Sequence, residues 1–241
     1  MPLSRRHKWI VIALFVYWPA LFIATHLPIH DLGRRTGMSD KTMHVLAYLG
    51  LVFFAWQAVS PDEKVNWFKP RVWIILVLIA WYGVMDEVLQ LLVGRSAEVG
   101  DFAANMFGAL TGLGILTVLS FWPAALLVSA IFTLALSNMA RIDQIAGMPF
   151  LNISFHFFAY AGFTLVWIQY LQDMVPWESS PVRWFAAALS VPAALLLLVK
   201  STAPLFGRDV WPFDYLTAAS GILFAAAVSR FVCRTMWLPA E

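Results

Sequence analysis

Eight apolar segments, each about as long as a membrane is thick, alternate with short polar connections along this 241-residue chain. A helix needs about 20 apolar residues to cross a bilayer, and a membrane-spanning backbone must satisfy its own hydrogen bonds. The segments lie at about residues 9–24, 43–60, 71–93, 101–120, 122–138, 153–172, 182–200 and 213–233. The sequence therefore predicts an all-α, polytopic membrane bundle of about eight transmembrane helices.

The composition excludes several other classes of protein. Charged residues make up 12% of the chain, against about 25% in soluble globular proteins. The net charge of +2 gives no support for a nucleic-acid partner. Cys233 is the only cysteine, so an internal disulfide and a cysteine-based metal site are excluded. HExxH, Gly-x-Ser-x-Gly and Walker-type motifs are missing, and we predict neither a metal nor a cofactor from the sequence.

The distribution of basic residues predicts the orientation. The basic start SRRHK precedes the first apolar run, and no small-x-small cleavage site follows that run, so we expect a retained first helix. Alternating the eight segments from an inside N-terminus puts nine Lys and Arg residues in the cytoplasm and seven outside. Four of the seven belong to the polar motifs described below, where a functional role can override the insertion bias. We therefore expect a multi-pass protein of the bacterial cytoplasmic (inner) membrane with both termini in the cytoplasm.

Two motifs recur at nearly constant distance and predict an internal repeat. His44 and Tyr48 match His156 and Tyr160 at an offset of 112 residues, while Gly94-Arg95 and Asp101 match Gly207-Arg208 and Asp214 at 113. We predict two pseudo-equivalent four-helix halves, residues 1–120 and 121–241. Since each half has an even number of spans, the halves are expected to be parallel, related by an axis along the membrane normal.

The two copies differ at three polar positions. Glu87 corresponds to Lys200, Asn105 to Ala218 and Lys41 to Ile153. The first half therefore keeps the fuller polar set, and we expect one working site and one supporting copy.

The stretch from Asp86 to Gly112 concentrates the candidate site, because ionisable residues within membrane spans are costly and are typical of functional positions. The predicted ligand-binding residues of the first half are Lys41, His44, Tyr48, Glu87, Gln90, Arg95, Asp101 and Asn105. Their partners in the second half are His156, Tyr160, Lys200, Arg208 and Asp214.

Individual roles follow from residue chemistry. His44 can act as a proton carrier or head-group ligand, or form a buried interhelical hydrogen bond to a carboxylate, and both interpretations stay open. Asp101 is interpreted as the N-cap of its helix, and Asp214 likewise. Glu87 has no such structural role and is the first candidate for a functional carboxylate. We expect Glu87 to lie close to His44 and to pair with Arg95 or Lys41.

Two glycines of the same stretch, Gly108 and Gly112, form a small-xxx-small face. We interpret this face as a site of close helix packing.

These residues resemble the pattern of the VanZ-like family of bacterial membrane proteins. The pattern joins Asp-Lys-x-x-His-x-x-x-Tyr, a Glu near the end of the next helix, and Gly-Arg followed by Asp, Asn and Gly. It is filled here by Asp40, Lys41, His44, Tyr48, Glu87, Gly94, Arg95, Asp101, Asn105 and Gly108. The resemblance covers roughly residues 9–120 and implies a cell-envelope membrane protein, in a family linked through its founding member to teicoplanin resistance. The doubled length departs from the basic unit of the family.

Three functions are compatible with this sequence. The first is a non-enzymatic binder or modulator of an anionic envelope lipid or lipid-linked glycan, with Lys41 and Arg95 meeting phosphate. The second is an enzyme acting on a lipid head group, with Glu87 or His44 as the catalytic base. The third, a proton-coupled lipid or solute carrier, is less favoured, because the charged residues lie at helix ends and a carrier site is expected near the midplane. The sequence does not identify the ligand or the oligomeric state.

Overall fold

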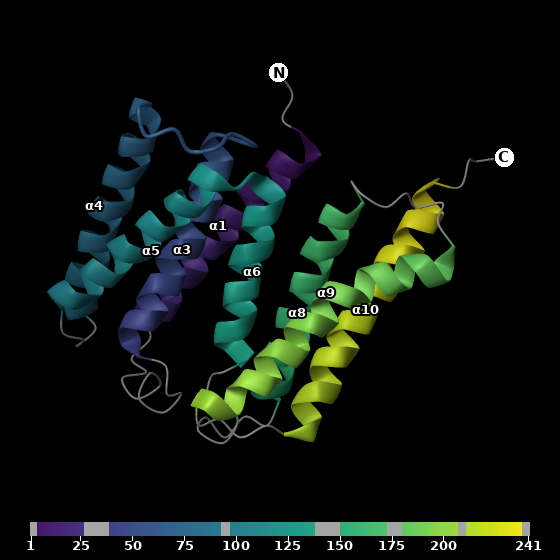
Figure 1. The fold of residues 1–241 in the computed structure, drawn as a ribbon. Helices are drawn as coiled ribbons and strands as arrows, with labels where there is room; N and C mark the ends of the chain where they lie inside the picture. The colour runs from purple at the N-terminus through teal and green to yellow at the C-terminus, as the bar shows by residue number, and fades with distance from the viewer. Residues whose placement is uncertain are drawn as a thin grey trace. The chain divides into compact units, whose positions relative to one another are not determined.

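The computed structural model describes residues 4–26, 39–92, 97–137, 150–172, 180–206 and 211–237, which form eight α-helices (Figure 1). The helices are α1 (Arg5–His26), α3 (Asp40–Val59), α4 (Pro70–Leu92), α5 (Val99–Val118), α6 (Phe121–Ser137), α8 (Leu151–Leu171), α9 (Pro181–Thr202) and α10 (Pro212–Trp237). A short 3-10 helix, η1 (Ala203–Phe206), follows α9. Each predicted apolar segment coincides with one helix, and the all-α helical bundle is confirmed.

Several helices begin at recognisable sequence signals. The hydroxyl of Ser39 accepts a hydrogen bond from the backbone N–H of Thr42 at the start of α3, and Ser180 does the same for Arg183 in α9. Prolines are the first residues of α4, α9 and α10, where a missing N–H costs no helical hydrogen bond. These signals set the helix starts independently of the apolar runs.

Six of the described helices are long and apolar enough to cross a membrane: α1, α3, α4, α5, α9 and α10. The apolar helix α6 is shorter, with 17 residues. Along α4, the large side chains of Trp73, Val77 and Trp81 are all more than half exposed. Exposure of such a continuous apolar face is unfavourable in water but not in lipid, and this supports membrane insertion.

The chain divides into two compact units, residues 1–124 and 125–241, with the boundary inside α6. We call them unit 1 and unit 2, and each is described by itself. The division predicted from the repeat, at residues 120 and 121, stays a prediction, as does the parallel relation of the two halves.

Unit 1 is built around α3, which runs between α5 and α1 (Figure 1). The approach of α5 to α3 depends on two glycines: a Cβ at Gly108 would collide with the backbone carbonyl of Val45, and one at Gly112 with the side chain of Val52. The close packing predicted for this glycine pair is therefore confirmed.

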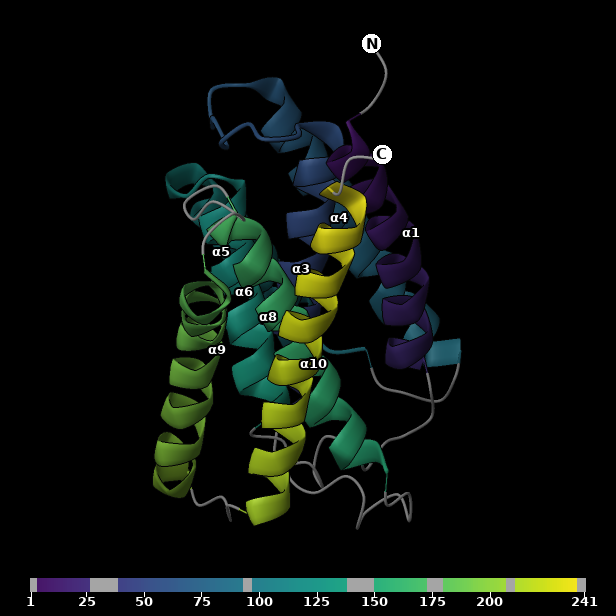
Figure 2. The same cartoon turned by 90° about the vertical axis from the view of Figure 1, so that its right-hand side faces the viewer.

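Unit 2 has its largest contact between α8 and α10, which lie side by side in both views (Figures 1 and 2). Gly221 of α10 faces the backbone carbonyl of Phe157, so that a Cβ there would also collide. One apolar cluster joins Ile168, Leu171, Trp184, Ala188 and Ala226, and another joins Tyr160, Leu196, Ala218 and Ile222.

The start of α1 and the connection between α3 and α4 meet at one end of unit 1. Arg6 forms an ion pair with Asp62, and the Nε2 atom of His7 lies 2.8 Å from the carbonyl oxygen of Ala58. This end carries six of the basic residues, Arg5, Arg6, Lys8, Lys64, Lys69 and Arg71. His44, Glu87 and Asp101 lie toward the opposite ends of their helices, so the basic residues and the candidate site are separated along unit 1.

Candidate functional site

Three helices of unit 1 bring buried polar side chains together. We call the set the unit 1 polar cluster: His44 and Tyr48 from α3, Asp86, Glu87 and Gln90 from α4, and Asp101 and Asn105 from α5. None of the seven is more than 6% exposed. Of the eight predicted residues of this half, six belong to the cluster, Lys41 lies at its exposed edge, and Arg95 lies outside the described residues.

His44 is held in one orientation by α5. Its Nδ1 atom lies 2.9 Å from the side-chain oxygen of Asn105, and because an amide oxygen only accepts, Nδ1 carries the proton and donates. When the ring is neutral, Nε2 keeps the lone pair. This atom lies 4.0 Å from a carboxylate oxygen of Asp40 and 4.0 Å from one of Asp101.

Asp86 is more deeply embedded than its neighbour Glu87. Its Oδ1 accepts from the hydroxyl of Thr25 at 3.0 Å, and its Oδ2 accepts from the amide of Gln90 at 3.2 Å. The Nδ1 atom of His26 lies 3.8 Å from Oδ1. Helix α1 thus contributes to the site through Thr25 and His26. Sequence reasoning placed neither these two residues nor Asp86 among the ligand-binding residues, although the four-residue spacing of Asp86 and Gln90 was an available signal.

Glu87 is only partly satisfied by hydrogen bonds. Its Oε2 accepts from the backbone N–H of Glu98 at 3.1 Å, and its Oε1 is buried without a hydrogen-bond partner among the described residues. Three more buried atoms of the cluster share this condition: Tyr48 Oη, Gln90 Oε1 and Asn105 Nδ2. Unsatisfied buried polar atoms are rare in folded proteins and are typical of functional positions or of positions that a ligand fills.

Lys41 is the exposed cation beside the cluster. Its ammonium lies 3.3 Å from Oδ1 of Asp101 and 3.4 Å from Oε2 of Glu98. Glu87 and His44 do lie close together, as predicted. The pairing of Glu87 with Arg95 or Lys41 stays a prediction, because Arg95 is outside the described residues and the hydrogen bonds found for Lys41 go to other carboxylates.

The predicted N-cap role of Asp101 is wrong. Helix α5 begins at Val99 with Glu98 at the cap position, so Asp101 lies in the first turn and its carboxylate pairs with Lys41. Asp214 likewise lies inside the first turn of α10, and its carboxylate accepts from Asn152 and Lys200. Helix α5 begins two residues before its apolar run, and α10 begins one residue before its own. Both aspartates therefore lie inside their helices, where their carboxylates contact other helices.

Unit 2 assembles a smaller polar group from its own helices. The ammonium of Lys200 lies 3.0 Å from Nε2 of His156 and 3.5 Å from Oδ2 of Asp214. The Nδ1 of His156 lies 3.0 Å from the backbone oxygen of Asn152, so this ring too carries its proton on Nδ1. Tyr160 is fully buried, and Arg208 lies outside the described residues.

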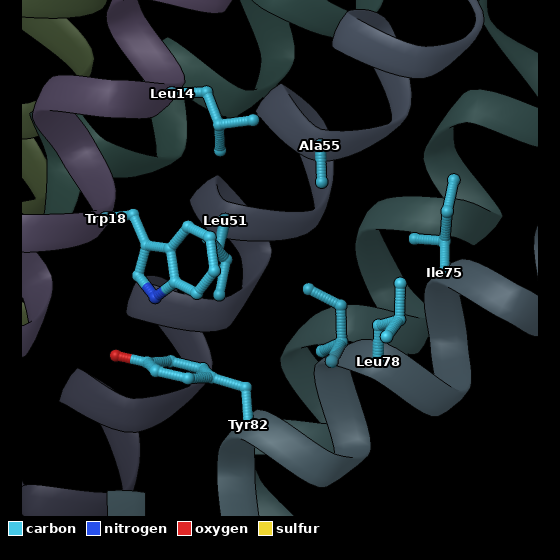
Figure 3. Close-up of a pocket in the computed structure, with 8 residues that line it drawn as sticks. Leu14, Trp18, Leu51, Ala55, Ile75, Leu78 and Tyr82 are labelled. Carbon is cyan, nitrogen blue, oxygen red and sulfur yellow. The ribbon is translucent and has the colours of Figure 1, made fainter.

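Two pockets flank the unit 1 polar cluster. A cavity of about 280 Å³ between α4 and the start of α5 is lined by Glu87 and Glu98 together with Val84, Val88, Ala97, Val99 and Phe102. A wholly apolar pocket of about 150 Å³ lies between α1, α3 and α4, and Figure 3 shows Trp18 and Tyr82 at one side of it. The ring of Tyr82 stacks on that of Tyr48, which connects this pocket to the cluster.

The cluster also contains atoms that suit a metal ion. One ligand atom each from His44, Asp86 and Glu87 lie within 4.8 Å of one another, and all three residues are buried. Asp40, His44 and Asp101 form a second such set, in which Asp40 is partly exposed. Imidazole and carboxylate groups are common ligands of divalent cations.

The apolar helices and the buried polar cluster define a multi-pass α-helical membrane protein. Comparison with protein families gives a match to the VanZ/LLP1 family model over residues 10–120. These residues contain the whole unit 1 polar cluster, and the predicted resemblance to the VanZ family is confirmed over this part of the chain. Neither a curated protein nor a solved structure gives a significant match.

Proposed function

We propose that this protein binds an anionic lipid or lipid-linked glycan of the bacterial cell envelope, with the head group at the unit 1 polar cluster. The observation that carries the proposal is the position of unpartnered buried polar atoms beside an apolar cavity. Glu87 belongs to both, since its Oε1 lacks a partner among the residues that the structure describes and its side chain lines the cavity. Such a site offers polar contacts to a head group and apolar walls to an acyl chain.

Lys41 is the residue that favours an anionic head group. Its side chain is 57% exposed, and its partner Glu98 is 54% exposed, so this ion pair is weakly held. A phosphate can therefore replace Glu98 at the ammonium at little cost, while the buried Asp101 keeps the lysine in place. The contact expected from Arg95 is part of the same proposal.

Lipid retention tests the proposal directly. The protein is reconstituted with mixed neutral and anionic lipids, and the lipids that remain bound after mild delipidation are counted by native mass spectrometry. Lys41→Gln should lower retention of anionic lipid, whereas Lys69→Gln, an exposed ion-paired lysine at the opposite end of unit 1, should not. Val88→Trp, which fills the cavity, should lower retention of all lipids relative to Val77→Trp on the lipid-facing side of α4. Equal retention in all four variants would refute lipid binding at this site.

An enzyme acting on a lipid head group is the second candidate. It is favoured by the unpartnered Oε1 of Glu87 and by the tautomer of His44, which leaves Nε2 as a proton acceptor. Incubation of the reconstituted protein with an envelope lipid extract should then release head groups, detected by mass spectrometry, and Glu87→Gln should stop the release. No release by the unsubstituted protein would leave binding as the function.

We also propose that the cluster faces the outer side of the cytoplasmic membrane, with both termini inside. The basic end of unit 1 supports this orientation, because Lys and Arg residues are retained on the cytoplasmic side of membrane proteins.

A further inference from the structure

The described residues of the unit 1 polar cluster carry an excess of buried negative charge. Asp86 and Glu87 are adjacent in α4 and both are buried. Lys41, at the exposed edge, forms its hydrogen bonds with Asp101 and Glu98. Buried carboxylates are tolerated when they are paired, hydrogen-bonded or bound to a metal. The hydrogen bonds from Thr25 and Gln90 satisfy Asp86, whereas Glu87 Oε1 has no hydrogen-bond partner within the part of the chain that the structure describes.

The polar group of unit 2 also contains a buried histidine and a buried carboxylate, but it contains a lysine as well. Lys200 is at the position that the repeat matches to Glu87. It is only 4% exposed, and its ammonium contacts Nε2 of His156. The same ammonium lies near Asp214, the residue matched to Asp101. A built-in cation therefore lies between a histidine nitrogen and a carboxylate in unit 2.

The packing of each unit supports this correspondence. Gly108 faces the backbone carbonyl of the residue after His44, and Gly221 faces that of the residue after His156. In both units Nδ1 of the motif histidine lies at hydrogen-bond distance from an oxygen atom, that of the Asn105 side chain in unit 1 and that of the Asn152 backbone in unit 2. In unit 2, Nε2 of His156 accepts from the ammonium of Lys200. In unit 1, a carboxylate replaces the lysine.

We propose that unit 1 binds a divalent cation through His44, Asp86 and Glu87, in the place that the ammonium of Lys200 takes in unit 2. The set of one imidazole and two carboxylates suits Mn²⁺ or Zn²⁺, which accept nitrogen and oxygen ligands. Two atoms that share such an ion at about 2.1 Å each lie at most about 4.2 Å apart. The ligand atoms lie within 4.8 Å of one another, so small side-chain movements close the site.

The unpartnered oxygens explain why this set is favoured over Asp40, His44 and Asp101. Glu87 Oε1 has no competing partner among the described residues, and Gln90 Oε1, on the side chain that donates to Asp86, is a further buried acceptor. Asp101, in contrast, is buried but already pairs with Lys41, and the side chain of Asp40 is partly exposed. The cation site does not rest on lipid binding, although a bound cation would also attract the phosphate of an anionic head group.

Binding of Mn²⁺ to the full-length protein in nanodiscs of neutral phosphatidylcholine tests the proposal without an anionic lipid. Loss of the free Mn²⁺ signal in electron paramagnetic resonance should give one ion per chain, displaced by Zn²⁺. Glu87→Gln and His44→Gln should each weaken binding by at least about ten-fold, since even residues behind metal ligands have effects of this size. The matched control His156→Gln removes the corresponding histidine of unit 2 and should bind Mn²⁺ as the unsubstituted protein does.

Glu87→Lys gives the sharpest comparison, because it copies the arrangement of Lys200 into unit 1. This variant should bind no Mn²⁺ and should unfold, without metal, at a temperature equal to or above that of the unsubstituted protein. No Mn²⁺ binding by the unsubstituted protein, or equal binding by Glu87→Gln, would overturn the proposal. If Glu87→Lys does not fold, the Glu87→Gln result decides alone.

Discussion

At the scale of single residues, His44 connects the helices of the site. It is on α3, donates to Asn105 on α5, and lies near the carboxylates of Asp86 and Glu87 on α4. The motif spacing predicted which of these residues belong together, because the polar positions recur one turn apart. It did not place Asp86 among the ligand-binding residues. The side chain of Asp86 projects about 100° around the helix from Glu87, and it accepts from Thr25 of α1, 61 residues away in sequence, as well as from Gln90.

Removal of the acceptor at Asn105 should be costly. In Asn105→Ala, the Nδ1–H of His44 remains buried without a partner, and we expect a loss of about 1–3 kcal/mol in the free energy of unfolding. Tyr48→Phe is the control, because the hydroxyl of Tyr48 has no partner in the described structure and its removal should cost less than about 0.5 kcal/mol. Thermal unfolding in detergent measures both. An equal loss in the two variants would contradict the described hydrogen bonding.

At the scale of elements, the sequence predicted every helix but not the helix ends. Hydropathy excludes polar residues from an apolar segment, so the segment of residues 101–120 began at Asp101, which was placed at a cap. The structure begins α5 at Val99, with Glu98 at the cap position. Because α5 begins two residues earlier than its apolar segment, Asp101 lies in the first turn and contacts Lys41 instead of capping the helix. Helix ends in this chain therefore depend on local capping and on contacts between helices, which hydropathy does not contain.

The contact between α3 and α5 gives a prediction at this scale. Gly108→Ala introduces a Cβ against the carbonyl of Val45, and separation of the two backbones should cost about 1–3 kcal/mol. Gly221→Ala should have a similar effect on α8 and α10 in unit 2. Gly114→Ala, where no atom lies within 4 Å of the new Cβ, should stabilise the helix by about 0.5–1 kcal/mol. Thermal unfolding of the three variants checks the order, and destabilisation by Gly114→Ala would contradict it.

At the scale of the whole molecule, the class of the protein followed from the apolar segments, and the family match covers the half that contains the fuller motif. The internal repeat stays a prediction, although both units place a glycine against the backbone after a motif histidine. Residues 94, 95, 207 and 208, which carry half of the repeat motif, lie outside the described ranges.

Orientation in the membrane is testable with reporters fused after Glu241. Both termini are expected in the cytoplasm, so a green fluorescent protein fusion should fluoresce and an alkaline phosphatase fusion should be inactive. Fusions truncated after Lys64 should behave in the same way. Active phosphatase at both positions would reverse the proposed orientation and place the cluster on the cytoplasmic side.

The central claim is that the unit 1 polar cluster is a binding site and not a structural ion pair. The thermal unfolding of Glu87→Gln in neutral nanodiscs without divalent cations tests it most directly, with Glu63→Gln as the control for an exposed, ion-paired glutamate. Glutamine keeps an oxygen for the N–H of Glu98 and removes a buried charge next to Asp86. If the carboxylate serves a ligand, Glu87→Gln should unfold at the same temperature as the unsubstituted protein or a higher one. A loss of about 3–5 kcal/mol, as expected when one partner of a buried ion pair is removed, would contradict the claim.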